Sequence, residues 1–171
     1  KIVTYAGLVW QQNIYGLWGG SSMPNKGYLD GNPKIAVFNN PFSIDMKKDK
    51  TMYVADMDND AIRVISPDGL TVSTLVNKNG PIQDSQIIDP QVLRLNSKEE
   101  LIIASKTNKK IWKVNQTNLT VDEIFQARLS GSLGSWLWLD VDVYGPPDSP
   151  YGSVGLKDEI FIATFGNSVV E

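Results

Sequence analysis

The sequence predicts an all-β fold made of repeated units of four short strands, and three observations predict it. A phrase in which Ala precedes Asn by four residues, and Asn precedes a β-branched residue by three, occurs at Tyr53–Ile62, Ile102–Ile111 and Phe161–Val170. The first two copies lie 49 residues apart, and so do Pro41 and Pro90. No stretch shows the spacing of a long amphipathic helix. Repeats of this length are typical of β-propeller blades, so the predicted fold class is a propeller arc of about three four-stranded blades.

The first full unit contains four predicted strands separated by turn residues. Its first strand alternates apolar and polar side chains, its second is an apolar run, and its fourth is rich in β-branched residues. Tight connections are predicted at Asp56–Asn59, where side chains bond nearby backbone groups, and at Pro67–Gly69. The strands are predicted at Phe42–Met46, Thr51–Ala55, Ala61–Ser66 and Thr71–Val76.

The second unit repeats this pattern, and the third follows it in part. Strands of the second are predicted at Val92–Leu95, Leu101–Ala104, Lys110–Val114 and Thr120–Phe125. The third begins with a strand at Trp136–Val143 and continues at Glu159–Thr164, after a loop rich in Pro and Gly. The whole chain is therefore predicted to be a single β-propeller segment. Its parts are an outer strand of a preceding blade at 1–7, an aromatic- and Gly-rich insertion at 8–26, blades at 27–76 and 77–126, and a partial blade at 127–171.

The segment 27–76 resembles an NHL repeat, the unit of one class of β-propeller. The matching residues are Gly27-Tyr28-Leu29-Asp30-Gly31, Ala36-x-Phe38-Asn39-x-Pro41, Tyr53-Val54-Ala55-Asp56-x-x-Asn59-x-x-Ile62-Arg63, Pro67-x-Gly69 and Val72–Leu75. The second unit keeps this frame but has Ser105 in place of the Asp and Trp112 in place of the Arg. The third keeps only the Ala-Thr-x-x-Asn core.

An arc of three blades leaves two blade faces and several strand edges uncovered, because propellers have about four to eight blades. Three solutions stay open. The remaining blades could belong to a longer polypeptide, which fits the absence of an initiator Met. Two copies could instead close a six-bladed ring, or the first strand of one copy could complete the last blade of the next. Such strand donation builds a filament when the contacts do not close.

Composition excludes several classes of function. The net charge is −3, and the Lys and Arg residues form no cluster larger than pairs such as Lys47-Lys48, so we expect no nucleic-acid partner. No apolar run is long enough to span a membrane. With no Cys, the chain has no disulfide, no thiol nucleophile and no Cys-based zinc site.

The absence of His argues against an active site in these blades. His is the commonest general base and a frequent metal ligand, and the chain contains none. NHL-like propeller enzymes that amidate peptides or open lactone rings generally rely on His, so no catalytic residue and no cofactor are predicted here. The alternative is that the chain is a fragment of such a hydrolase or lyase, with its active-site residues in blades not present in this sequence.

Carboxylates are the remaining metal-ligand candidates, and they are weak ones. Asp140 and Asp142 lie on one face of a predicted strand and would line the channel if that strand is innermost. The series Asp56-x-Asp58-x-Asp60 is similar to the start of a calcium loop. It lacks the Gly and the terminal Glu of such loops, however, and turn and solvent-facing roles explain it better.

Aromatic side chains are the stronger candidates for binding. Trp10, Tyr15 and Trp18 fall in the insertion, and Trp136 and Trp138 fall near the start of the third unit. Long loops at a propeller rim often carry function, and Trp can anchor a protein partner or stack on a sugar. A local core in which the loop packs on itself is the competing explanation.

Two consecutive acceptor triplets for N-glycosylation begin at Asn115 and Asn118, on a predicted turn between outer strands. They favour an extracellular or secreted protein. Taken together, the sequence favours a structural or interaction module that associates with protein, either through self-association or with further blades, and that could contact glycan.

Overall fold

A computed structural model gives the structure of the chain, and it describes residue 6 and residues 27–83, 86–105 and 107–126. It also describes the backbone of four strands further along the chain: β9 (Arg128–Leu129), β10 (Leu139–Val143), β11 (Ile160–Thr164) and β12 (Ser168–Val169). Regular structure in these parts is β-strand, apart from a single 3-10 turn, η1 (Met57–Asn59). The all-β prediction is confirmed.

Two four-stranded antiparallel sheets form the body of the described structure. In blade 1 the strand order is β1 (Pro41–Met46), β2 (Met52–Asp56), β3 (Ala61–Ile65) and β4 (Val72–Val76). In blade 2 it is β5 (Pro90–Leu95), β6 (Leu101–Ser105), β7 (Lys110–Asn115) and β8 (Thr120–Gln126). Consecutive strands pair as neighbours in both sheets, as in the blades of a propeller.

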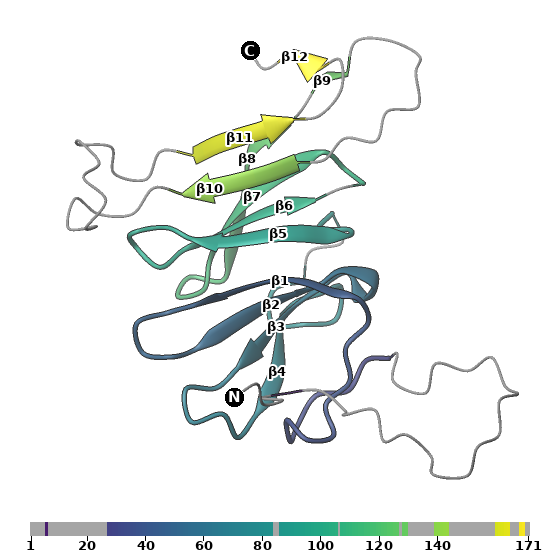
Figure 1. Ribbon diagram of the computed structural model, residues 1–171, viewed down its shortest axis with the longest axis vertical. Coiled ribbons are helices and arrows are strands. Elements are labelled where there is room, and N and C mark those ends of the chain that lie inside the picture. The colour runs from purple at the N-terminus through teal and green to yellow at the C-terminus, as the bar shows by residue number, and fades with distance from the viewer. Residues whose placement is uncertain are drawn as a thin grey trace, which may run out of the picture.

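The remaining strands form two antiparallel pairs, β10 with β11 and β12 with β9. Strand β10 lies next to β5, just as β5 lies next to β1 (Figure 1). The first strands of three successive units are therefore neighbours. This is the arrangement of innermost propeller strands around a channel.

The 49-residue repeat also appears in the backbone conformation. Three pairs of non-glycine residues with positive φ lie 49 positions apart: Asn40 and Asp89, Lys50 and Glu99, and Asp60 and Lys109. Irregularities in strand pairing repeat in the same way, at Pro41/Ser43 and Pro90/Val92, and again at Ile62/Arg63 and Ile111/Trp112. Left-handed turns and bulges are therefore conformational features of the repeat. Asn and Asp occupy only some of these positions with positive φ, and Lys and Glu occupy the others.

The main hydrophobic core lies between the two sheets. Because side chains alternate along a strand, Tyr53 and Ala55 of β2 face blade 2, whereas Val54 packs on the opposite side of the sheet. Blade 2 contributes Leu93, Leu101 and Ile103 to the same core. Further members from both sheets and from the link between them are Ile62, Val76, Ile82, Ile87, Trp112 and Val114.

Side chains of β1 also bind the backbone of β5. The Ser43 hydroxyl lies 3.2 Å from the N–H nitrogen of Leu93, which donates to it, and 3.3 Å from the Leu93 carbonyl oxygen. The N–H of Leu95 donates to Asp45 Oδ2 at 2.8 Å. Polar side chains of one inner strand therefore satisfy backbone groups on the exposed edge of the next.

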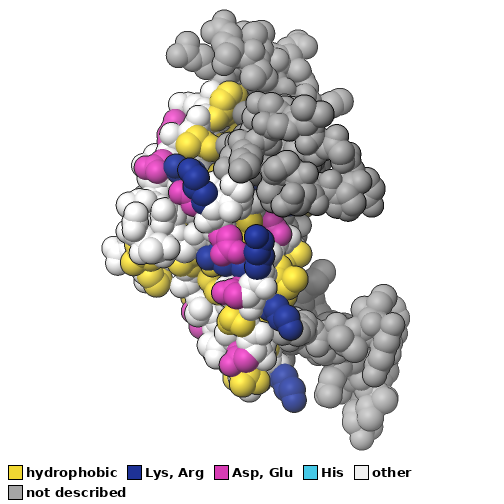
Figure 2. Space-filling view, turned by 90° about the vertical axis from the view of Figure 1, so that its left-hand side faces the viewer, with side chains coloured by type: hydrophobic (Ala, Val, Ile, Leu, Met, Phe, Trp, Pro, Cys, Tyr) yellow, Lys and Arg dark blue, Asp and Glu magenta, His cyan; other side chains and the backbone are white. Residues whose placement is uncertain are grey.

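Charges at one end of the sheets are mixed in sign. Figure 2 faces the end that carries the β1–β2 and β5–β6 turns, and it shows Lys and Arg interspersed with Asp and Glu over the described surface. Lys47 Nζ of the first turn lies 3.9 Å from Glu99 Oε2 of the second. In the part of the chain that the structure describes, no helix is long and apolar enough to cross a bilayer.

Truncation of Ile103 tests the role of the shared core. Ile103 is fully buried between the blades, so Ile103→Ala should lower the free energy of unfolding by about 2–5 kcal/mol. The control Ile124→Ala removes the same atoms from an exposed position on β8 and should cost about 0.5 kcal/mol. Chemical denaturation of both variants measures the difference. Equal losses would show that the blade-to-blade core does not carry the stability.

Candidate functional site

One side of blade 1 presents apolar side chains to solvent. Phe42, Ile44 and Met46 alternate along β1 with Ser43 and Asp45, and they are 49%, 56% and 55% exposed. Since Ser43 and Asp45 face blade 2, these three apolar residues face away from it. We call this side of the sheet the open face of blade 1; its described apolar residues are Phe38, Phe42, Ile44, Met46, Met52, Val54 and Ile65.

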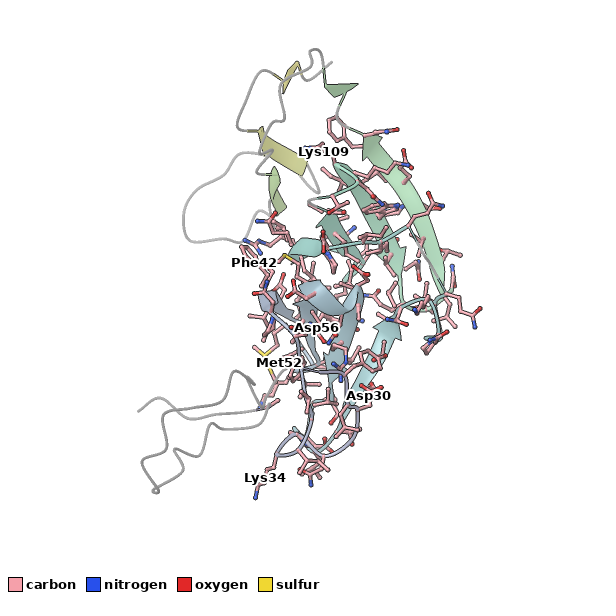
Figure 3. The ribbon with its side chains drawn as sticks, turned by 90° about the vertical axis from the view of Figure 1, so that its right-hand side faces the viewer. Asp30, Lys34, Phe42, Met52, Asp56 and Lys109 are labelled. Carbon is pink, nitrogen blue, oxygen red and sulfur yellow. The ribbon has the colours of Figure 1, made fainter. Side chains whose placement is uncertain are left out.

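The open face is hollowed. A concavity of about 320 Å³ lies over β1, β2 and β3, and its lining is mostly apolar. Figure 3 labels Phe42 and Met52, which lie toward one side of the described structure, while Asp30 lies toward the other side. The lining residues are Ala6, Phe38, Pro41, Phe42, Ser43, Ile44, Met52, Val54 and Ile65.

Blade 2 shows what the equivalent face looks like when it is covered. Gln91 and Leu93 occupy the positions of Phe42 and Ile44, 49 residues later, and they are 3% and 0% exposed. Leu93 is part of the core shared with blade 1, and β5 lies against β1. The open face of blade 1 therefore has the chemical character of a blade-to-blade contact but has no blade against it among the described residues.

A buried arginine connects the strands of blade 1 to the segment 27–39 that precedes them. The Arg63 side chain is fully buried on β3, and its Nη1 donates to Asp56 Oδ2 at 2.8 Å. Its Nε and Nη2 donate to Asp30 Oδ1 at 3.1 and 2.6 Å. Nη1 also donates to the Val37 carbonyl, and Nη2 donates to that of Leu29. Each guanidinium nitrogen thus has an acceptor, as a buried charge requires.

Aromatic rings complete this site. The Arg63 guanidinium carbon lies 4.7 Å from the centre of the Tyr28 ring and 4.8 Å from that of Phe38, which favours the cation. Asp56 also accepts from the N–H of Asn39 and from Asn59 Nδ2. The network therefore joins the segment 27–39 to β2 and β3, and it positions Phe38 beside the open face.

Blade 2 fills the equivalent space without an ion pair. Trp112 replaces Arg63 and is 2% exposed in the shared core, and Ser105 replaces Asp56. The Ser105 hydroxyl donates to the carbonyl of Ile88. Ile88 is the counterpart of Asn39, whose N–H donates to Asp56 in blade 1. The same frame is therefore stabilised by a charged network in one blade and by an aromatic side chain in the next.

A second, more polar cavity of about 440 Å³ lies where the β2–β3 turn meets the β4–β5 link. Asp58 Oδ1 accepts from Asn40 Nδ2, and Asp60 Oδ1 accepts from the N–H of Asp89. The Nδ2 of Asn77 donates to the Asn59 carbonyl at 3.3 Å. The cavity is lined by Tyr28, Asp58, Asn59, Asp60, Asn77, Lys78, Asn79, Ile87 and Ile88, and these hydrogen bonds hold the turn against the link.

Two exposed carboxyl groups have lowered pKa values, and both belong to turns. The N–H of Thr51 donates to Asp49 and lowers the pKa of that carboxyl. The Ser66 hydroxyl, and after it the N–H of Leu70, lowers the pKa of Asp68. These carboxylates stabilise the β1–β2 and β3–β4 turns.

The structure separates the carboxylates of the Asp56-x-Asp58-x-Asp60 series. Asp56 is buried and bound to Arg63, whereas Asp58 and Asp60 are exposed on the turn. This agrees with the predicted turn and solvent-facing roles. Within the described residues, no group of three or more Asp, Glu, His or Cys side chains could hold a metal ion.

All five binding residues predicted from the sequence lie outside the described residues. These are Trp10, Tyr15, Trp18, Trp136 and Trp138. Asp140 and Asp142 lie on β10, where the backbone pairs them with Ala163 and Phe161 of β11. Their metal-binding role stays a prediction.

The two predicted glycosylation sites lie at the β7–β8 turn and differ in their surroundings. Asn115 Oδ1 accepts from the N–H groups of Thr117 and Asn118, and its Nδ2 donates to Glu100 Oε1 at 3.4 Å. Asn118 is exposed, and its side chain forms no hydrogen bond with the described residues. The acceptor nitrogen of Asn118 is thus the more accessible one.

The sequence predicted that blade faces would be uncovered, but it did not identify the residues that form the open face, nor the buried Arg63. The alternation of Phe42, Ile44 and Met46 predicted their strand, but a period of two is the same whether or not a partner covers the apolar side. For Arg63 there was a signal: an Arg on a strand seven residues after an Asp, within the repeat phrase.

Two lyase structures are similar to part of this chain. No protein family and no curated protein matches it. A selenomethionine-substituted virginiamycin B lyase from Staphylococcus aureus has a TM-score of 0.44 and 13% identity, over 60% of this chain and 31% of that one. A streptogramin B lyase structure has a TM-score of 0.39 and 18% identity, over 48% and 25%. The chain spans about a third or less of those proteins, and lyase activity is stated of them alone.

Loss of Arg63 tests the buried network. Arg63→Met leaves the Asp56 carboxylate buried without its cation, so it should lower the free energy of unfolding by about 3–5 kcal/mol. Lys113→Met is the control, because Lys113 lies 3.9 Å from Glu100 and from Asp122 near the surface and should cost at most about 1 kcal/mol. Chemical denaturation compares the two variants. Similar losses would contradict the central role of Arg63.

The double variant Asp56→Ser/Arg63→Trp copies the residues of blade 2 into blade 1. It should be more stable than the sum of its single changes predicts, because no unpaired buried charge remains. A double-mutant cycle by chemical denaturation measures this coupling. Additive losses would show that the two residues do not act as a pair.

Proposed function

We propose that the chain is an interaction module of the NHL-repeat type, and that it self-associates when the open face of blade 1 receives a propeller blade of a second copy. The mechanism is burial of apolar surface together with bonding of the edge of β1. Neither step needs a cofactor or a chemical reaction.

The contrast between equivalent positions of the two blades carries this proposal. Ile44 is 56% exposed and its counterpart Leu93 is fully buried, although both are large aliphatic residues at the same position of the repeat. Completing the burial of Phe42, Ile44 and Met46 would contribute on the order of 1 kcal/mol each. The concavity beneath them offers room for side chains of an incoming sheet.

The NHL assignment is supported by the chemistry of blade 1. Asp56, Asn59 and Arg63, which belong to the repeat phrase, form one hydrogen-bonded group in which Asp56 and Arg63 are buried. The Asp30 of the opening Gly-Tyr-Leu-Asp-Gly stretch joins the same group through Arg63. The residues that carry the resemblance are thus the residues that hold this blade together.

Substitution of Ile44 tests the proposal. Ile44→Lys places a charge at the centre of the open face, where docking of a second copy would bury it, so we expect the assembled species to dissociate to monomers. Leu119→Lys is the control, since Leu119 is similarly exposed but lies on the β7–β8 turn and should leave association unchanged. Sedimentation velocity over a range of concentrations measures the masses.

If the wild-type chain stays monomeric at all concentrations, the proposed self-association is wrong. The open face would then be the contact surface for a blade of another polypeptide segment. Equal effects of the Ile44 and Leu119 substitutions would also contradict the proposal.

An extracellular location is part of the proposal and is supported by the acceptor triplets on the β7–β8 turn. In a secretory expression host we expect Asn118 to carry the glycan, because Asn115 is engaged with Glu100 and with its own turn. Asn118→Gln should then remove the glycan mass, and Asn115→Gln should leave it in place. Mass spectrometry before and after endoglycosidase treatment decides this. A secreted protein without glycan, or one whose glycan depends on Asn115, would contradict the assignment.

A further inference from the structure

The backbone register of β10 matches that of β1 at two positions. In β1, Ser43 pairs with Ala55 of β2, and Asp45 pairs with Tyr53. In β10, Asp140 pairs with Ala163 of β11, and Asp142 pairs with Phe161. Ala55 and Ala163 are the same Ala of the repeat phrase. Asp140 and Asp142 therefore hold the strand positions of Ser43 and Asp45.

These positions have a defined role in β1. Ser43 and Asp45 accept the N–H groups of Leu93 and Leu95, on the inner strand of the next blade. The corresponding residues of β5 are Val92 and Arg94, and the valine has no side-chain acceptor. Among the three inner strands, the first and the third therefore carry oxygen acceptors at both positions.

The groups that such acceptors would meet are present on the open face. Ile44 and Met46 of β1 are the counterparts of Leu93 and Leu95, 49 residues earlier, and both are more than half exposed. The N–H of Met46 donates to Asp45 Oδ1 of its own strand at 2.7 Å, and this is a local bond that docking can exchange. The turn that follows Met46 carries Lys47, Lys48 and Lys50, which favours the approach of carboxylates.

We propose that β10 of one copy lies beside β1 of a second copy, which places the strand positions of Asp140 and Asp142 next to the backbone of Ile44 and Met46. This inference rests on the proposed self-association and names the surface that meets the open face. Two copies joined in this way at both ends would bring six blade units together, within the range of about four to eight that propellers use.

Substitution of the two carboxylates tests the assignment. Asp140→Ala/Asp142→Ala removes both acceptors, and hydrogen bonds to charged groups are strong enough that the dissociation constant should rise about tenfold or more. Asp140→Asn/Asp142→Asn keeps a carbonyl acceptor at each position but removes the charge, so its dissociation constant should lie between those of the wild type and the alanine variant. Asp122→Ala/Glu123→Ala is the charge-matched control at two exposed positions of β8 and should behave as the wild type.

Sedimentation velocity of these variants, with circular dichroism to establish folding, gives the readout. Wild-type association that the alanine pair leaves unchanged would overturn this inference while the proposed function stands. Asparagine variants as weak as the alanine variants would also overturn it, because an acceptor at these two positions would then contribute nothing to association. Dissociation of the wild type by a chelator would overturn it in favour of a metal site. A monomeric wild type would instead be the failure of the proposed function.

Discussion

The structure depends on one interaction, the packing of the face of one four-stranded sheet against the next. Tyr53 and Ala55 of blade 1 meet Leu93 and Ile103 of blade 2 in the core between the sheets, and a sheet that is apolar on one face has to bury that face against another element. The edge of each inner strand is a second part of the same contact, because Ser43 and Asp45 satisfy the N–H groups of β5. Where this contact is present, Leu93 is fully buried; where it is absent, Ile44 is exposed.

Within each blade the same backbone frame is held by different chemistry. Blade 1 uses Arg63 between two carboxylates and two aromatic rings, whereas blade 2 uses Trp112. The charged network fixes the segment before β1 through contacts with Asp30, Val37 and Leu29. A buried ion pair is weak evidence for stability but suits a role in orientation. Here it orients Phe38, which lines the open face.

The strands were predictable because their signals are local. Alternation in β1, the apolar run of β2 and the turn residues at Asp56–Asn59 fix the elements to within a residue or two. The start of β5 was missed, since Pro90 and Gln91 precede the predicted Val92 and a bulge falls between Pro90 and Val92. The burial of Arg63 was not predictable, because Asp30 and the Leu29 carbonyl reach it across more than thirty residues of sequence. Exposure of the open face likewise depends on which surfaces meet it, and no local pattern records that.

Amide hydrogen exchange at Ile44 and Leu93 tests most directly whether an open blade face needs another blade. The two N–H groups hold equivalent positions, and only that of Leu93 is covered by a neighbouring inner strand among the described residues. Blade docking predicts that the exchange of Leu93 is slow at every protein concentration, and that the exchange of Ile44 slows as the concentration rises and copies associate. Fast exchange of Ile44 in an associated sample, or slow exchange in a monomer, would contradict the role assigned to this face.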